Sequence, residues 1–437
     1  MLAEFSSSGG PGGRLQSRTL AAAHLPMPPQ LAAILRQLCG HDYGRPEAVS
    51  ELEAEALAAA ALAHLYARCV RQLLAQAGVR EVAAIGAHGQ TVRHYPRGPA
   101  CPAAAELGAR LAAEAAAGEA EDRGAPSGTT PTVQPPRAIG FTRQLLDASL
   151  LAELCRCGPV VADLRSRDVA AGGEGAPLVP AFHRATFASA SPESASMMMA
   201  VVNLGGIANL SAWIEGREAD PPIGWDVGPG NVLLDAWAAR HLGAAYDADG
   251  AWAAGGKVSD ELLHLMESDV YFAQEPPKST GRETFKEAWL EKVLARLALS
   301  GASKLEPRDV QATLVRLTAA TAARDITLAH NMLQRRQGDT GTAAPAGWTV
   351  VLCGGGARNS FLREALAAQI RAAAAGMPQP PRFTRVATSD EFGVPAEHVE
   401  ALAFAYLAQQ RMLLRPGNVS AVTGAAGPRV LGAIYAG

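Results

Sequence analysis

The chain has 437 residues, of which 48% are hydrophobic and 19% charged, and its formal net charge is -3. This length suffices for two or three domains, and the balanced charge excludes a strongly basic nucleic-acid-binding protein. No apolar run is long enough to predict a membrane span, and the six cysteines lack zinc-site or disulfide-framework spacing. We therefore expect a cytoplasmic protein with reduced thiols and with neither nucleic acid nor membrane as a partner.

Residues 1–13 are rich in Ser and Gly and contain no apolar core, so they do not form a secretory signal. We interpret them as a disordered leader, with an organelle transit peptide as the weaker alternative. Residues 14–24 are predicted to form a strand, residues 31–38 a short helix and residues 47–77 a long Ala- and Leu-rich helix.

A strand predicted over residues 81–85 is followed by the sequence GAHGQT. Polar groups there would lie at the carboxyl end of a strand, where α/β proteins collect ligands. The segment that contains His88, Gln90 and Thr91 is therefore a place where a ligand could bind. The alternative is a tight turn with a hydrogen-bonded His88. Metal binding is not predicted, because no carboxylate partner is in view.

Residues 97–131 are of low complexity, which we interpret as an insertion or mobile loop. A helix over residues 141–155 and a strand over residues 159–163 follow. Arg165 and Asp168 then lie in a short charged segment, DLRSRD. Such charges indicate either salt-bridged packing, which is the commoner case, or the polar wall of a substrate cleft.

Residues 201–237 place a Gly205-Gly206 pair between two apolar runs, which predicts a β-hairpin. Asp226 follows at the mouth of the glycine-rich turn DVGPGN, which leads into a helix. A carboxylate there could act as a general base or could simply cap the turn. The hairpin glycines leave backbone N–H groups uncovered, which suits phosphate oxygens.

The sequence CGGGARN at residues 353–359 lies between a predicted strand (349–352) and a predicted helix (362–373). This arrangement is typical of nucleotide binding, although it is neither a Rossmann fingerprint nor a P-loop. Upstream, the loop PPKSTGRE presents Lys278, Ser279 and Arg282, and a helix is predicted over residues 309–333. Glu400 begins an apolar helix, where an acid can also simply complement the helix dipole.

These motifs together closely resemble the anhydro-N-acetylmuramic acid kinase family. The segments that carry the resemblance are NLGGIANLS, WDVGPGNVLLDAW, PPKSTGRE, DVQATL, CGGGARN and EALAFAYLA. The resemblance runs from about Arg14 nearly to the C-terminus. It implies an α/β fold of two ribonuclease-H-like lobes, as in actin, Hsp70 and hexokinase, with a cleft between them. We expect a first lobe over residues 1–165 and a second over 166–437, with the last helix and tail packing back on the first.

The family opens the 1,6-anhydro bond of its sugar with water and phosphorylates O6 from ATP with Mg²⁺, as part of cell-wall amino-sugar metabolism. The resemblance implies that Asp226 is the base that activates the water. The implied sugar contacts are His88, Gln90, Thr91, Arg165, Asp168 and Glu400. The implied nucleotide contacts are Gly205, Gly206, Asn209, Gly228, Gly230, Asn231, Gly354, Gly355, Gly356 and Asn359. No protein metal site is implied.

The chain departs from the family at its start. The family begins with a strand and a hairpin of the type MSGTSxDG, and nothing before Arg14 resembles it. We therefore expect an incomplete first lobe. A truncated or degenerate sugar-binding protein without turnover stays open as the alternative to an active sugar kinase. The family forms dimers, so the resemblance also leaves a homodimer open.

Overall fold

The computed structural model describes residues 1–8, 14–39, 49–98, 102–122, 139–188, 196–281, 284–301, 304–338 and 345–437. The chain divides into two compact units. Unit 1 comprises Met1–Ala23, Ala176–Leu407 and Ala421–Thr423, and unit 2 comprises His24–Gly175, Ala408–Ser420 and Gly424–Gly437. The main division thus falls ten residues after the expected one, and the first 23 residues belong with the larger unit.

Unit 1 is built on a five-stranded sheet of order β11-β10-β7-β8-β9. Its strands are β7 (Met198–Leu204), β8 (Ile207–Ile214), β9 (Ile223–Pro229), β10 (Trp348–Cys353) and β11 (Thr384–Thr388). Strands β7 to β9 form an antiparallel meander, whereas β10 runs parallel to both β7 and β11. The predicted hairpin at Gly205-Gly206 is therefore the β7–β8 turn.

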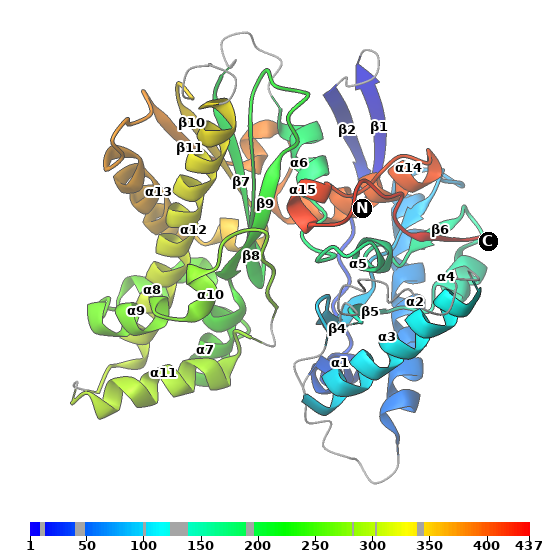
Figure 1. Cartoon of the computed structure of the whole chain (residues 1–437), viewed down its shortest axis with the longest axis horizontal. Helices are drawn as coiled ribbons and strands as arrows, with labels where there is room; N and C mark the ends of the chain where they lie inside the picture. Colours follow the sequence, from blue (N-terminus) through cyan, green and yellow to red (C-terminus); the bar gives the residue numbers. More distant parts are fainter. Residues whose placement is uncertain are drawn as a thin grey trace. The chain divides into compact units, whose positions relative to one another are not determined.

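Two long helices, α12 (Pro307–Gly338) and α13 (Ser360–Ala375), lie beside this sheet (Figure 1). Leu317 and Ile326 of α12 are fully buried in one core cluster with Trp225 and Trp348 of the sheet. The other helical elements that lie wholly or partly in unit 1 are α6 (Pro180–Phe187), α7 (Val232–Leu242), η2 (Ala248–Gly250), α8 (Ala251–Ala254), α9 (Asp260–Glu267), α10 (Val270–Ala273), α11 (Glu287–Leu299), η3 (Gly355–Arg358), η4 (Ser389–Phe392), η5 (Ala396–His398), α14 (Val399–Met412) and α15 (Ser420–Thr423).

The expectation of a disordered leader is wrong for the described part of residues 1–13. Strand β1 (Leu2–Ser8) pairs antiparallel with β2 (Arg14–Ala21), which confirms the strand predicted from Arg14. Partly buried Met1, Ala3 and Phe5 pack against a core cluster that includes Phe182 and Phe187. This apolar contact explains why the segment orders. Residues 9–13 lie outside the described part of the chain.

Unit 2 has a three-stranded sheet of order β12-β6-β3 and a separate antiparallel pair, β4–β5. The strands are β3 (Ile85–Gly86), β4 (Gln90–Tyr95), β5 (Phe141–Leu145), β6 (Val160–Ala162) and β12 (Ala433–Tyr435). The helices are α1 (Pro29–Cys39), α2 (Glu51–Ala77), α3 (Pro102–Asp122), α4 (Ala148–Cys155) and α5 (Ser166–Ala170). Helix α2 begins with a capping box between Ser50 and Glu53 and ends at Gly78, whose φ is 66°.

Three predicted elements of unit 2 are corrected. Residues 141–145 form strand β5 rather than the start of a helix, because they pair with β4 and alternate in burial. The strand expected over 81–85 shrinks to Ile85–Gly86. Much of the low-complexity stretch forms helix α3, as its Ala and Glu content favours. The rest of residues 97–131, apart from 97–98, lies outside the described residues.

Candidate active site

Two glycine turns of unit 1 are joined by backbone hydrogen bonds. The amides of Gly230 and Asn231 donate to the carbonyls of Gly206 and Gly205 at 2.9 and 2.8 Å. The Asn231 side-chain amide donates to the carbonyl of Leu204 at 2.9 Å. The β7–β8 turn and the turn after β9 therefore form one surface of closely spaced backbone.

The third glycine turn, Gly354 to Gly356, packs against the same surface. A Cβ atom at Gly354 would lie 2.4 Å from Asn203 Oδ1, and one at Gly356 would lie 2.7 Å from Asn231 Oδ1. Only glycine permits this approach, and the φ of +81° at Gly354 also favours glycine. Three glycine turns distant in sequence thus converge at one end of the sheet, as a phosphate-binding surface requires.

Asn209 and Asn359, the remaining polar candidates on this surface, differ in their surroundings. Asn359 Oδ1 accepts from the amide of Leu362 at 2.9 Å, so this side chain caps helix α13. In contrast, Asn209 Oδ1 is buried without a hydrogen-bond partner. A buried acceptor that the protein leaves unsatisfied fits a site that receives a donor from a ligand or water.

Asp226 lies on β9, directly opposite Asn209 of β8 in the strand register. Its side chain is oriented by the PPKSTG loop. Asp226 Oδ2 accepts from the Ser279 hydroxyl at 2.7 Å and from the amide of Thr280 at 3.0 Å. The residue is only 6% exposed. A carboxylate held this way is positioned to accept a proton from a bound hydroxyl or water.

The main chain of Asp226 is fixed as well. The Tyr271 hydroxyl donates to the Asp226 carbonyl at 2.5 Å, and the Asp226 amide donates to the Lys278 carbonyl at 3.3 Å. The capping alternative would have paired this carboxylate with the start of α7. Instead, Asn231 is the N-cap residue of α7. The observed partners of the carboxylate come from residues 279 and 280.

A buried charged pair next to Asp226 was not predicted from the sequence. Asp325 of α12 is 0% exposed, and its Oδ2 accepts from the indole Nε1 of Trp225 at 2.8 Å. Lys278 Nζ lies 3.5 Å from the same oxygen. Burial lowers the pKa of Lys278, and the charge of Asp325 opposes this shift. Two signals were available, namely an acid among small and apolar residues of a long helix and a lysine beside Ser279. Arg282 lies outside the described residues.

The candidate sugar contacts of unit 2 include a linked pair, His88 and Arg165. Arg165 Nε donates to His88 Nε2 at 2.9 Å, and an Arg165 terminal nitrogen donates to the Gly175 carbonyl at 2.9 Å. His88 Nδ1 lies 2.8 Å from the carbonyl of Gly89, so the neutral tautomer with the proton on Nδ1 satisfies both contacts. Burial, and secondarily the Arg165 cation, lower the pKa of His88 to about 3.

Gln90 and Thr91 lie on β4, and the Gln144 side-chain amide donates to the Thr91 hydroxyl at 3.3 Å. Asp168 is 0% exposed. Its two carboxylate oxygens accept from Asn418 Nδ2 at 2.6 Å and from the Gly175 amide at 2.8 Å. These contacts favour a role for Asp168 in holding unit 2 segments together.

Glu400 is exposed in the first turn of α14, in unit 1. Burial and, second, the charge of Glu400 raise the pKa of Cys353, the residue before Gly354. The structure thus brings Asp226, Asn209 and the glycine turns together within unit 1. It also pairs His88 with Arg165 in unit 2.

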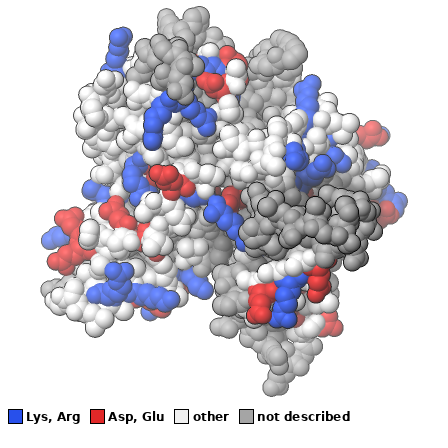
Figure 2. Space-filling view, viewed as in Figure 1, with Lys and Arg blue, Asp and Glu red and all other residues white. Residues whose placement is uncertain are grey.

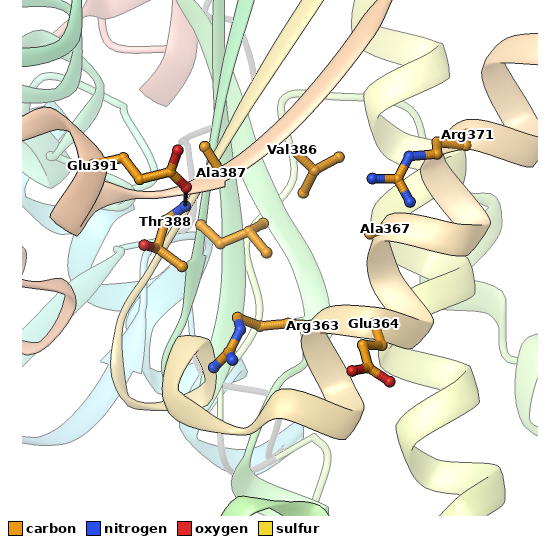
Figure 3. A pocket seen from close by; sticks show the side chains of 9 residues that line it. Arg363, Glu364, Ala367, Arg371, Val386, Ala387, Thr388 and Glu391 are labelled. Atoms are coloured by element: carbon orange, nitrogen blue, oxygen red, sulfur yellow. Dashed lines mark hydrogen bonds between the residues drawn. The ribbon is translucent and has the colours of Figure 1, made fainter.

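A separate pocket of unit 1 lies between α13 and β11 (Figure 3). It is lined by Leu352, Arg363, Glu364, Ala367, Arg371, Val386, Ala387, Thr388 and Glu391. Glu391 accepts from the Thr388 amide at 3.1 Å. Since its lining shares no residue with the predicted site, this pocket is not a candidate for the reaction.

The charged side chains visible in Figure 2 are mixed in sign rather than gathered in one field. Within the described residues, no three His, Cys, Asp or Glu side chains are grouped so as to hold a metal ion. None of the helices searched in the described part of the chain is long and apolar enough to cross a membrane.

Comparison with known proteins agrees with these motifs. The family model for anhydro-N-acetylmuramic acid kinase matches residues 13–117 and 109–437. Relatives named anhydro-N-acetylmuramic acid kinase come from Cupriavidus pinatubonensis (46% identical, covering 95% of this chain and 90% of the relative) and Ralstonia nicotianae (44%, 95% and 90%). Another is from Bordetella pertussis (46%, 95% and 88%).

Among solved structures, a ROK hexokinase from Thermus thermophilus aligns with 78% of this chain and 84% of its own. The identity is 17% and the TM-score 0.26. The family model and the sequence relatives, in contrast, cover nearly the whole chain. The chain belongs to the anhydro-N-acetylmuramic acid kinase family.

Proposed function

We propose that this chain is a sugar kinase that opens 1,6-anhydro-N-acetylmuramic acid with water and transfers the γ-phosphoryl group of ATP to O6. The products are N-acetylmuramic acid 6-phosphate and ADP. The observation that carries the proposal is the held carboxylate of Asp226, with Ser279 and Thr280 on Oδ2. Membership of the family supplies the substrates.

In the proposed reaction, Asp226 accepts a proton from a water as its oxygen bonds to C1 of the sugar. The C1–O6 bond breaks, and O6 attacks the γ-phosphorus as the bond to the ADP oxygen breaks. The proton on Asp226 then leaves to solvent. A positioned base of this kind contributes about 10² to 10⁴ in rate.

The converged glycine turns would hold the ATP phosphates, because glycine lets a ligand approach the backbone closely. Their fit rests on the Cβ clashes at Gly354 and Gly356. The unsatisfied buried Oδ1 of Asn209 would accept a hydrogen bond from a water or from a hydroxyl or amino group of a ligand. Mg²⁺ would arrive bound to the phosphates and neutralise their charge, as it commonly does without an all-protein cage. Since ATP is its phosphate donor, the enzyme would work in the cytoplasm.

His88 and Arg165 are the contacts we propose for the sugar from unit 2, with Gln90 and Thr91 beside them. Because Arg165 Nε and the Gly89 carbonyl already engage the two ring nitrogens of neutral His88, its contact with the sugar would be a packing contact, and Arg165 would supply the hydrogen bonds. Glu400 of unit 1 is a further proposed sugar contact. For Asp168 we propose an indirect role, because both of its oxygens already bind protein donors.

The test is a product assay with purified chain, anhydro-N-acetylmuramic acid and Mg-ATP. We expect a phosphomonoester on the sugar by ³¹P NMR, formed in a 1:1 ratio to ADP. Non-hydrolysable ATP analogues should give neither phosphorylated nor opened sugar, because in the proposed reaction cleavage of the C1–O6 bond and phosphoryl transfer to O6 share one transition state. Sugar binding without product, measured by calorimetry, would contradict the proposal and support a protein that has lost turnover.

A further inference from the structure

The buried Lys278–Asp325 pair takes no part in the chemical steps proposed above. Both side chains are at most 2% exposed, and the Nζ–Oδ2 distance is 3.5 Å. Burying two charges is expensive, and apolar residues of similar volume are often as stable or more so. A buried charged pair at this position therefore calls for an explanation other than stability.

Asp325 contacts both segments that fix the position of Asp226, namely the strand that carries it and the loop that binds its carboxylate. Its Oδ2 accepts from the indole of Trp225, the residue before Asp226 on β9. The same oxygen faces Lys278, the residue before Ser279 in the loop that binds Asp226 Oδ2. One carboxylate oxygen of α12 thereby fixes the strand that carries Asp226 and the loop that orients it.

Further contacts reinforce this arrangement. Lys278 Nζ lies 4.9 Å from the ring centroid of Tyr271, whose hydroxyl donates to the Asp226 carbonyl. Arg324 binds Asp325 Oδ1 from the more exposed side, with nitrogen–oxygen distances of 3.0 and 2.8 Å. Both carboxylate oxygens are thus occupied, so Asp325 is held in one orientation and cannot itself reach a substrate.

We infer that Lys278 and Asp325 are positioning residues, which hold the Asp226 carboxylate in register with the Ser279-Thr280 loop. This role rests on the proposed function. Its prediction is specific: loss of the pair lowers kcat while the KM for sugar and for ATP changes little. A displacement of about 1 Å at a reacting group can lower a rate on the order of 100-fold.

The chain offers a matched control on the same helix. His330 is 2% exposed, and its Nδ1 accepts from the indole of Trp348 at 3.0 Å. Asp325→Leu and His330→Leu each remove a buried acceptor from a tryptophan. The double variant Lys278→Met with Asp325→Leu replaces the charges with apolar groups and should regain stability that Asp325→Leu loses. Asp325→Asn keeps the shape and the acceptor for Trp225 if the other variants fold poorly.

The experiment measures kcat, both KM values and the folded fraction by near-UV circular dichroism at one temperature. Per folded molecule, we expect the double variant and Asp325→Asn to lose about 30-fold or more in kcat, whereas His330→Leu stays within about threefold of wild type. Losses that match His330→Leu, or a double variant as active as wild type, would overturn the positioning role alone. A wild-type chain without turnover would overturn the proposed function and this role together.

Discussion

Asp226 and Asp168 are both buried aspartates in charged or glycine-rich motifs, yet their surroundings differ. Asp168 is 0% exposed, and its two oxygens join Gly175 to Asn418, a residue 250 positions away along the chain. Asp226 keeps 6% exposure, and its Oδ2 is oriented by residues of one loop beside three glycine turns. A carboxylate bonded to remote segments stabilises a fold, whereas one held at the mouth of a glycine surface can exchange a proton.

The largest effect should follow from Asp226→Asn. The amide cannot accept the proton of water, so we expect kcat to fall about 10³-fold with the KM for ATP nearly unchanged. Asp247→Asn is the matched control, because Asp247 is 7% exposed and its oxygens bind the amides of Trp252 and Ala253. A loss below about tenfold in Asp226→Asn, measured in the product assay, would rule out Asp226 as the base.

The glycine surface can be tested with two glycines of nearly equal φ. Gly354 has φ +81° and lies against Asn203, whereas Gly393 has φ +82° and open space within 4 Å of the point where a Cβ would lie. Alanine at either position adopts an unfavourable backbone conformation. Only Gly354→Ala also distorts the proposed phosphate surface, so we expect its KM for ATP to rise about tenfold. Equal KM values in the two variants would argue against nucleotide binding here.

For Asp168→Ala we expect a loss of stability rather than of chemistry. The substitution leaves the buried donors of Gly175 and Asn418 without an acceptor, which should lower the free energy of unfolding by about 3 kcal/mol. Urea unfolding followed by circular dichroism measures this change. If unfolding is unaffected while the KM for sugar rises sharply, Asp168 contacts the substrate directly and our comparison of the two aspartates is wrong.

The smallest effect near neutral pH concerns the titration of His88. The pKa of His88 is lowered to about 3 in the folded chain, from an ordinary value of 6.5. Between these values the unfolded chain binds the extra proton, so stability falls as pH falls from 6.5 toward 3. Replacing His88 by Gln should flatten this dependence by at most about 1.4 kcal/mol per pH unit. Replacing the exposed His264 by Gln is the control, and identical slopes for both variants would contradict a neutral buried His88.

Much of unit 1 was predictable because its signals are local. The Gly205-Gly206 hairpin, the strand before Gly354 and the helix after it follow from apolar runs interrupted by glycine. The convergence of the three turns was not visible, since it depends on the order in which five strands assemble. The resemblance to the family, rather than hydrophobic periodicity, predicted that the residues of the three glycine turns form one site.

The wrong predictions in unit 2 fall where the local sequence signal is weak or ambiguous. Residues 141–145 have no helix or strand signal strong enough to decide, and pairing with β4 makes them a strand. Pro102–Asp122 has the composition of a low-complexity stretch, although its Ala and Glu residues favour a helix.

Asp325 of unit 1 was missed because its role depends on Trp225 and Lys278, which lie 100 and 47 positions earlier in the chain.

The role of Asp226 is tested most directly by running the reaction in H₂¹⁸O, quenching it within seconds and analysing the product by mass spectrometry. If Asp226 activates water toward the sugar, ¹⁸O appears on C1 of the product and the phosphate group stays unlabelled. Label in the phosphate, with C1 unlabelled, would mean that the water attacks phosphorus. That result would contradict the role assigned to Asp226.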